Sequence, residues 1–236
     1  QMPDIYPEHH ARGPGGGQTR LNQTFVQVEA DDGATGLFGP IFGEAAPIIL
    51  AKLRPLLLGQ DPLAYELIWD QLYRGDRHAR KGYEMMAISA VDCALWDLRG
   101  KILDQPVYKL LGGGFRKTFV AYASILFGDT PQETERIGRQ LAEQGYRAVK
   151  FGWGPMGQSE ESDIAHVKAA RRGIGDGIEL IVDGGLCWDT ATAIRRAQQF
   201  EQFNLTWLEE PLHPDNVEGY GRLSGALAAE QPDHQE

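Results

Sequence analysis

Three charged residues each lie at or near the end of a short apolar run in the second half of the chain. Lys150 lies in the run RAVKFGW, Asp183 ends the run ELIVD, and Glu209 ends the run LTWLE. An apolar run of this length indicates a strand buried on both faces, as in a parallel sheet. Two carboxylates at neighbouring strand ends can hold a hard divalent cation through oxygen, and a lysine opposite them suits an anionic substrate or a proton transfer. The three residues therefore predict a shared site, while the alternative for each one alone is a solvated charge at a strand end.

The spacing of these residues matches one strand–helix unit of a barrel. They lie 33 and 26 residues apart, close to the roughly 30 residues that each unit of an eight-fold β/α barrel occupies. Catalytic groups in such barrels lie at the carboxyl ends of different strands. We therefore expect the three side chains to point into a common mouth.

Strand and helix patterns alternate from about residue 117 onward. TFVAYASIL is expected to be the first strand, Thr130 begins a capping box with proline at the first helical position, and Asp189 is expected to cap a later helix. This order predicts an α/β fold with a parallel sheet. About 120 residues follow position 117, enough for four units where a closed barrel needs eight. We expect residues beyond this sequence to complete the barrel, and the fragment alone to aggregate through its unpaired edges.

The first half of the chain has a different pattern. Apolar and polar residues alternate over Gln23–Glu29, which predicts a strand that a turn joins to a second strand or loop. Asp61 is expected to cap one helix, and a longer helix is expected over Tyr83–Lys101. Strands followed by helices predict an α+β domain over residues 1–116, before a partial barrel over residues 117–236.

Composition excludes several classes of protein. The net charge is −10 and no basic run is present, which argues against nucleic-acid binding. No stretch of about 18 apolar residues predicts a membrane span, and QMPDIYPEHH lacks the apolar core of a signal peptide. Cys93 and Cys187 give no disulfide framework and fit a reducing compartment. We therefore expect a cytoplasmic protein.

One long motif resembles a known family. SAVDCALWDLRGKILDQPVYKLLGG, over residues 89–113, is similar to the connection between cap and barrel in the mandelate racemase branch of the enolase superfamily, and GYRAVKFG, IVDGG and WLEEPL follow in the family's order. The resemblance covers roughly residues 24–225. It implies an α+β capping domain on a modified eight-stranded barrel, with a divalent ion, usually Mg²⁺, held by carboxylates from three successive strand ends. The ion stabilises the enediolate that forms when a base removes the proton α to a substrate carboxylate.

The resemblance implies roles for individual residues. By position, Asp183 corresponds to the first metal ligand and Glu209 to the second, with Glu210 as the acid beside them. Lys150 corresponds to the first lysine of a Lys-x-Lys pair, which would neutralise the substrate carboxylate. Glu230 resembles a remnant of the third ligand's motif, although it lacks the preceding strand and comes early in the chain.

The chain departs from the family pattern at several positions. Gly152 stands where the second lysine is expected, on the same face of the strand as Lys150, so the usual base on that side is missing. Gly185 stands where the family often has asparagine. Asp233 and His234 resemble the family's base dyad compressed into one tail, and the alternative for them is a polar terminus.

These observations lead to three hypotheses. The first is magnesium-dependent dehydration of a sugar acid, an aldonate or aldarate, to a 2-keto-3-deoxy acid by a homo-oligomeric enzyme. The second is a racemase or cycloisomerase of the same family, which shares the first step. The third, which Gly152 and the incomplete barrel favour, is an inactive relative that serves as a structural subunit. A base on one face only favours dehydration or cycloisomerisation over racemisation.

Overall fold

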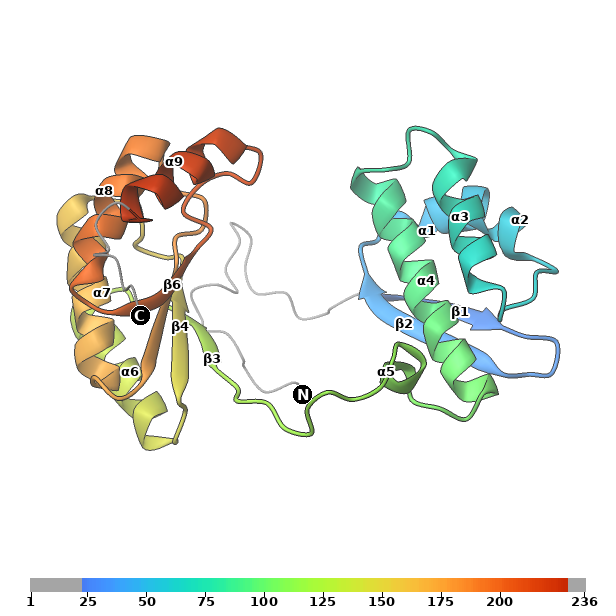
Figure 1. Cartoon of the computed structure of the whole chain (residues 1–236), viewed down its shortest axis with the longest axis horizontal. Helices are drawn as coiled ribbons and strands as arrows, with labels where there is room; N and C mark the ends of the chain where they lie inside the picture. The colour runs from blue at the N-terminus through green and yellow to red at the C-terminus, as the bar shows by residue number, and fades with distance from the viewer. Residues whose placement is uncertain (1–22, 229–236) are drawn as a thin grey trace, which may run out of the picture. The chain divides into compact units, whose positions relative to one another are not determined.

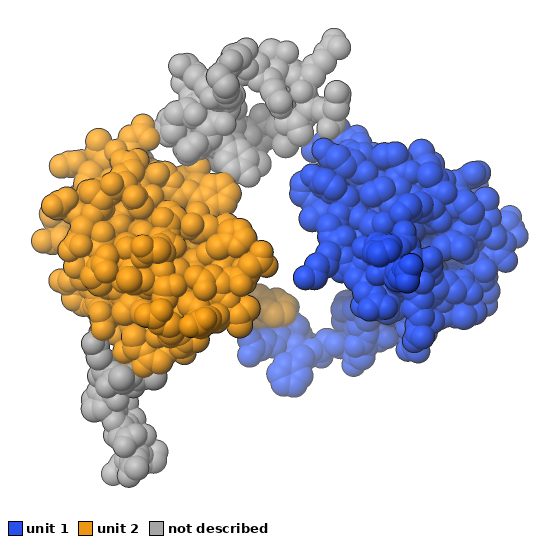
Figure 2. All heavy atoms as spheres, turned by 90° about the horizontal axis from the view of Figure 1, so that it is seen from above, with its two compact units in different colours: residues 1–117 blue, residues 118–236 orange. Residues whose placement is uncertain are grey.

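The computed structural model shows a chain folded into two compact units, which Figure 2 distinguishes by colour. Unit 1 comprises residues 1–117 and unit 2 comprises residues 118–236. The structure describes residues 23–228. Each unit has its own hydrophobic core, so each is stabilised by its own buried side chains.

Unit 1 is built from an antiparallel hairpin and a long helix. Strand β1 (Thr24–Glu29) pairs with β2 (Thr35–Ile41), and both pack on α4 (Gly82–Ile102). The helix approaches the hairpin so closely that a Cβ at Gly36 would lie 2.0 Å from the carbonyl oxygen of Ala94. Glycine is therefore required at this crossing. The predicted long helix is confirmed, and its side chains Ile88, Val91, Leu95 and Leu98 are all buried.

One predicted helix start in unit 1 is wrong. Helix α3 begins at Tyr65 rather than directly after Asp61. The Asp61 carboxylate accepts a hydrogen bond from the backbone N–H of Leu63 at 2.9 Å, which closes a short turn before the helix. On this helix Ile68 and Leu72 are buried, whereas Leu67 is exposed. The remaining helices of the unit are α1 (Ala45–Ile48), the π-helix η2 (Ile49–Leu53), α2 (Arg54–Leu57) and α5 (Val107–Leu110).

Unit 2 contains a four-stranded parallel sheet whose strands follow one another in chain order (Figure 1). The predicted α/β alternation and parallel pairing are thus confirmed. The first strand is shorter than expected, because pairing begins at Ala123 rather than at Thr118. The strands are β3 (Ala123–Leu126), β4 (Ala148–Gly152), β5 (Glu179–Asp183) and β6 (Leu205–Glu209).

Four helices of unit 2 alternate with these strands, and Figure 1 shows α6, α7 and α8 together on one side of the sheet. Both predicted caps are confirmed: the Thr130 hydroxyl accepts from the N–H of Glu133 at 3.2 Å, and the Asp189 carboxylate accepts from that of Thr192 at 2.7 Å. Val149 and Phe151 belong to the core beneath these helices. Alternate strand residues therefore point to the opposite face. The helices are α6 (Pro131–Glu143), α7 (Glu160–Ile174), α8 (Thr190–Glu201) and α9 (Val217–Ala228).

The structure also describes the two cysteines and the length and polarity of the helices. Cys93 and Cys187 are both free thiols. None of the helices between residues 23 and 228 combines the length and the apolar character that crossing a membrane requires.

Candidate active site

The parallel register aligns three strand ends of unit 2 in one row. Gly152 at the end of β4 pairs with Asp183 at the end of β5, which in turn pairs with Glu209 at the end of β6. Lys150 lies two residues before Gly152, so both residues face the same side of the sheet. The row lies at the carboxyl edge of the sheet, which is where the sequence placed a shared site.

Lys150, Asp183 and Glu209 form one charged cluster, here called the site triplet. The Lys150 ammonium donates a hydrogen bond to Glu209 Oε1 at 2.5 Å and lies 3.6 Å from Asp183 Oδ2. The side chains of Lys150 and Asp183 are only 13% and 10% exposed. The structure thus brings these predicted residues together, while their roles in binding metal and substrate stay predictions.

The protonation of the site triplet follows from its contacts. Burial opposes the charge of Lys150, but the hydrogen bond to Glu209 and the nearby carboxylates outweigh it and raise the pKa of the lysine. The pKa of Glu209 is lowered, chiefly by the hydrogen bond from Lys150 and then by that from the Trp207 indole. The lysine therefore remains a cation and the glutamate an anion near pH 7.

Two glycines shape the surroundings of Asp183. The N–H of Gly185 donates to Asp183 Oδ1 at 2.9 Å, which fixes one oxygen and leaves the other facing Lys150. A Cβ at Gly152 would lie 3.0 Å from the Cβ of Asp183 and 3.3 Å from its Oδ2. Gly152 therefore leaves the space in which the Asp183 side chain packs, in addition to removing a potential base.

Left-handed backbone follows each of the three strand ends. Trp153, Leu186 and Glu210 have φ angles of 55°, 64° and 44°, which few residues other than glycine adopt. Backbone strain of this kind concentrates at functional sites. Sequence reasoning missed these positions, because neither hydrophobic periodicity nor turn composition marks Trp, Leu or Glu as left-handed.

Aromatic residues that sequence reasoning also missed lie beside the site triplet. The Trp207 indole donates to Glu209 Oε2 at 3.1 Å, and the Tyr122 ring meets it edge-on with centroids 6.0 Å apart. Lys150 Nζ lies 5.9 Å from the Tyr122 ring centroid, within reach of a cation–π contact. A usable signal was present, since Trp207 lies two residues before Glu209 and therefore shares its face.

The other predicted site residues are not part of the described row. Glu210 is exposed, and its carbonyl oxygen accepts from the N–H of Leu186 at 2.8 Å. Glu230, Asp233 and His234 lie outside the described residues. Between residues 23 and 228 no three His, Cys, Asp or Glu side chains are grouped so that they could hold a metal ion.

The donor chemistry of the row nevertheless fits Mg²⁺. Asp183 and Glu209 both contact the same ammonium group, so one cation already lies between their oxygens. Mg²⁺ prefers oxygen ligands and is commonly bound by one or two carboxylates together with waters and substrate oxygens. Asp183 and Glu209, at adjacent strand ends, therefore provide the two carboxylate ligands that a Mg²⁺ site of this kind needs.

Two family models match the amino-acid sequence of this chain. Residues 7–112 match the mandelate racemase/muconate lactonizing enzyme N-terminal domain, and residues 133–232 match a domain described as enolase C-terminal domain-like. The chain belongs to the mandelate racemase/muconate lactonizing enzyme family of the enolase superfamily.

Individual relatives include lyases and isomerases. The chain is 34% identical over 92% of its length to L-rhamnonate dehydratase of Saccharopolyspora erythraea, and 36% identical over 84% to 3,6-anhydro-alpha-L-galactonate cycloisomerase of Streptomyces coelicolor. A mandelate racemase/muconate lactonizing protein of Paracoccus denitrificans, solved with magnesium, matches 86% of the chain at 30% identity and a TM-score of 0.77, with 58% of its own chain covered. The chain covers 55% and 56% of the two enzymes, and thus spans about half the length of these curated relatives.

Proposed function

We propose that the protein is a magnesium-dependent enzyme that removes the proton α to the carboxylate of a sugar acid and then expels water. Unit 1 would be the capping domain and unit 2 the first part of a β/α barrel, within a homo-oligomer. The observation that carries the proposal is the site triplet at three aligned strand ends. The similar proteins support this proposal, because they include dehydratases and cycloisomerases that are named for sugar acids.

In this proposal each residue of the site triplet has a separate role. Asp183 and Glu209 would hold Mg²⁺, with Glu230 as the third ligand. The bound ion would supply a Lewis acid that stabilises negative charge as it develops on the substrate carboxylate. Lys150 stays protonated because of its carboxylate neighbours, so its ammonium would neutralise the substrate carboxylate and lower the cost of forming a dianion.

The proton must be taken from the face opposite Gly152. Glycine offers no proton acceptor, and the resemblance places a histidine, oriented by an aspartate, on the other side of the substrate. A neutral histidine is suited to accept an α-proton near pH 7, and the protonated ring can then assist departure of a β-hydroxyl as water. Racemisation needs proton transfer on both faces, so a single base favours dehydration or cycloisomerisation over racemisation.

The test is incubation of an intact homologue that carries the KFG motif with Mg²⁺ and a panel of aldonates and aldarates in deuterium oxide, followed by NMR and mass spectrometry. We expect a 2-keto-3-deoxy acid from only one of two C2 epimers. Deuterium at C2 of both epimers without loss of water would require a second base and would contradict the proposal.

Cycloisomerisation is the second candidate, because two curated relatives of similar identity, 31% and 36%, are cycloisomerases. It shares proton abstraction but conserves the mass of the substrate, so the same experiment separates it from dehydration. Absence of both turnover and Mg²⁺ binding would instead favour the third hypothesis, a structural subunit without catalysis.

A further inference from the structure

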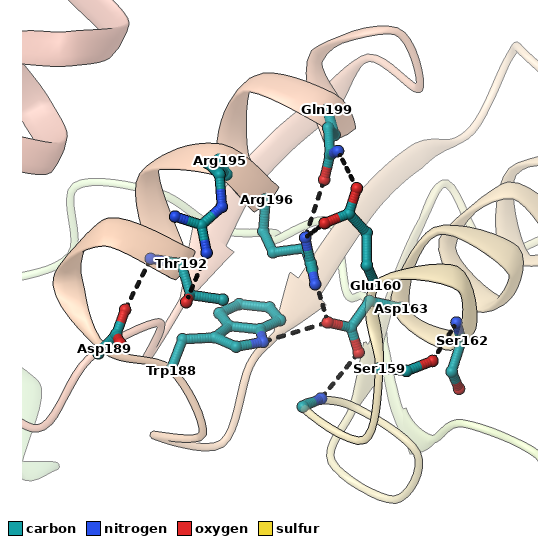
Figure 3. A network of polar contacts seen from close by, with 11 residues as sticks. Ser159, Glu160, Ser162, Asp163, Trp188, Asp189, Thr192, Arg195, Arg196 and Gln199 are labelled. Carbon is teal, nitrogen blue, oxygen red and sulfur yellow. Dashed lines mark hydrogen bonds and ion pairs between the residues drawn. The ribbon is translucent and has the colours of Figure 1, made fainter.

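Asp163 is a buried carboxylate outside the site triplet, and it accepts hydrogen bonds from segments that are distant from one another in the sequence. Asp163, on α7, is fully buried and accepts hydrogen bonds from three separate groups (Figure 3). The N–H of Gly157 donates to Oδ1 at 2.7 Å, while Arg196 Nε and the Trp188 indole donate to Oδ2 at 2.8 and 3.2 Å. A buried charge is tolerated only when it is paired and fully hydrogen-bonded, as this one is.

The donors come from the two loops that follow the site strands. Gly157 lies in the loop between β4 and α7, and Trp188 lies in the loop between β5 and α8. Strand β4 carries Lys150 and strand β5 ends at Asp183. Asp163 therefore joins the chain segments that leave the site from two neighbouring strands.

The Trp188 ring connects Asp163 to the turn beside Asp183. Its Cζ3 atom lies 2.8 Å from the place that a Cβ of Gly184 would occupy, so the ring packs tightly on that backbone. Gly184 directly follows Asp183, and the N–H of Gly185 holds Asp183 Oδ1. The orientation of the Trp188 ring thus limits the position of the turn that orients the Asp183 carboxylate.

The second connection runs through Gly157. A Cβ at Gly157 would lie 2.7 Å from Cys187 Cβ and 2.9 Å from its sulfur, so the two loops are in contact at this point. The hydrogen bond from the Gly157 N–H to Asp163 anchors the first loop against the second. Both loops are therefore held at one buried carboxylate.

We propose that Asp163 is a positioning residue of the candidate active site. By binding Gly157 and Trp188 together it fixes the two loops, and through them the orientation of the Asp183 carboxylate. The part of this proposal that concerns metal affinity rests on the proposed function, while the part that concerns the loops does not.

The outer half of the network provides a matched control. Arg196 Nη1 also contacts Glu160 Oε2 at 2.8 Å and Gln199 Oε1 at 3.1 Å. The Glu160 side chain is 49% exposed, and its contacts with Arg196 and Gln199 do not include either loop. Glu160→Gln thus alters a carboxylate of the same network while leaving the three donors of Asp163 in place.

The variant that tests the proposal is Asp163→Asn, which keeps the shape of the side chain. Its amide NH₂ must replace one carboxylate oxygen and then faces a donor instead of accepting from it. Placing the NH₂ toward Gly157 loses one hydrogen bond, whereas the other orientation loses two. We therefore expect the loop that contains Gly157 to loosen most.

Two measurements on the whole protein report the result. Hydrogen–deuterium exchange, which needs no metal, should become faster in segments 153–159 and 184–189 in Asp163→Asn and not in Glu160→Gln. Calorimetric titration with Mg²⁺ should show about tenfold weaker binding in Asp163→Asn, the lower end of what loss of a supporting contact costs a metal site. Thr134→Val removes a buried hydroxyl that pairs with His166 and makes no hydrogen bond to Asp163, so this variant controls for lost stability.

The outcomes are distinguishable. Unchanged exchange in both segments would overturn the proposal, as would faster exchange with unchanged Mg²⁺ affinity. If Thr134→Val melts at the same temperature as Asp163→Asn and weakens Mg²⁺ binding as much, lost stability alone explains the effect. That result would also overturn the proposal. If the parent protein binds no Mg²⁺, the proposed function fails, and the exchange of the two loops alone decides whether Asp163 holds them.

Discussion

Lysine, aspartate and glutamate meet in one cluster in each unit, as far as residues 23–228 are concerned. In unit 1, Lys52 donates to Asp76 and Glu84 at 3.0 and 2.8 Å, forming what is here called the surface triplet. Hydrogen bonds with Glu84 and then Asp76 raise the pKa of Lys52, just as carboxylate contacts raise the pKa of Lys150 in the site triplet. The Lys52 side chain is 50% exposed, against 13% for Lys150. The two clusters thus share their residue types and similar contact distances, and they differ in the burial of the lysine.

The backbone that carries each cluster makes the difference. The surface triplet joins side chains from η2, from the start of α4 and from the loop after α3, and its lysine is half exposed. The site triplet lies on three hydrogen-bonded strands, and left-handed turns follow each strand end. Exposed ion pairs contribute little because water and salt screen them. A rigid sheet edge instead holds charges close together at a fixed geometry, which is what binding and catalysis require.

The largest expected effect comes from removing a carboxylate of the site triplet. Asp183→Ala should abolish measurable Mg²⁺ binding in calorimetry and lower turnover by at least on the order of 10³-fold, because the charge that holds the ion is lost. Asp76→Ala makes the same change in the surface triplet and should leave both quantities at the parent level. Activity near the parent level in Asp183→Ala would show that the metal assignment is wrong.

The next effect concerns the lysines. Lys150→Met should lower turnover on the order of 10²-fold, because the substrate carboxylate loses its counter-charge. Its Mg²⁺ affinity should be unchanged or tighter, since the ammonium that contacts both carboxylates no longer competes with the ion. Lys52→Met is the matched control and should change neither. Weaker Mg²⁺ binding in Lys150→Met would mean that the lysine only supports the carboxylates.

A smaller effect is expected at Gly152. In Gly152→Ala the new methyl group would lie 3.0 Å from Asp183 Cβ, closer than carbon atoms normally approach. The aspartate must therefore move, and Mg²⁺ affinity should fall several-fold with little change in melting temperature. Gly221→Ala on α9 is the control, because among residues 23–228 no atom beyond its own helix lies within 4 Å of the new methyl. Equal Mg²⁺ affinity in the parent and Gly152→Ala would argue against a role for the close Gly152–Asp183 contact.

The smallest effect belongs to the surface triplet and depends on pH. The pKa of Asp76 is lowered from its ordinary 3.8, first by the backbone N–H of His78 and then by Lys52. A lowered acid pKa stabilises the fold above the ordinary pKa, and this contribution is lost as the pH falls through the lowered value. Asp76→Asn should therefore melt slightly below the parent near neutral pH. The difference should shrink as the pH falls below 3.8 and vanish once the pH is below the lowered pKa of Asp76. A difference that persisted in acid would have to come from something other than the charge.

Local sequence determined much of the scaffold. The apolar runs that contain Lys150, Asp183 and Glu209 became strands β4 to β6, and the caps at Thr130 and Asp189 began helices as expected. These features depend on contacts between residues close in sequence or on burial of a whole strand, so the pattern of residue types is sufficient to predict them.

Other features were decided only by the tertiary structure. The helix expected after Asp61 begins later, because its carboxylate closes a local turn instead of capping the helix. The left-handed turn at Trp153 also had no sequence signal, since it depends on a hydrogen bond to the neighbouring strand.

The same limit applies to the residues around the site. Asp163 had the pattern of an ordinary helical surface residue, yet its three donors come from segments 6, 25 and 33 residues away. The sequence alone indicated which charges belong to the row at the sheet edge. Only the folded chain showed the donors that surround Asp163, because a buried carboxylate is stabilised by groups that become its neighbours when distant segments pack together.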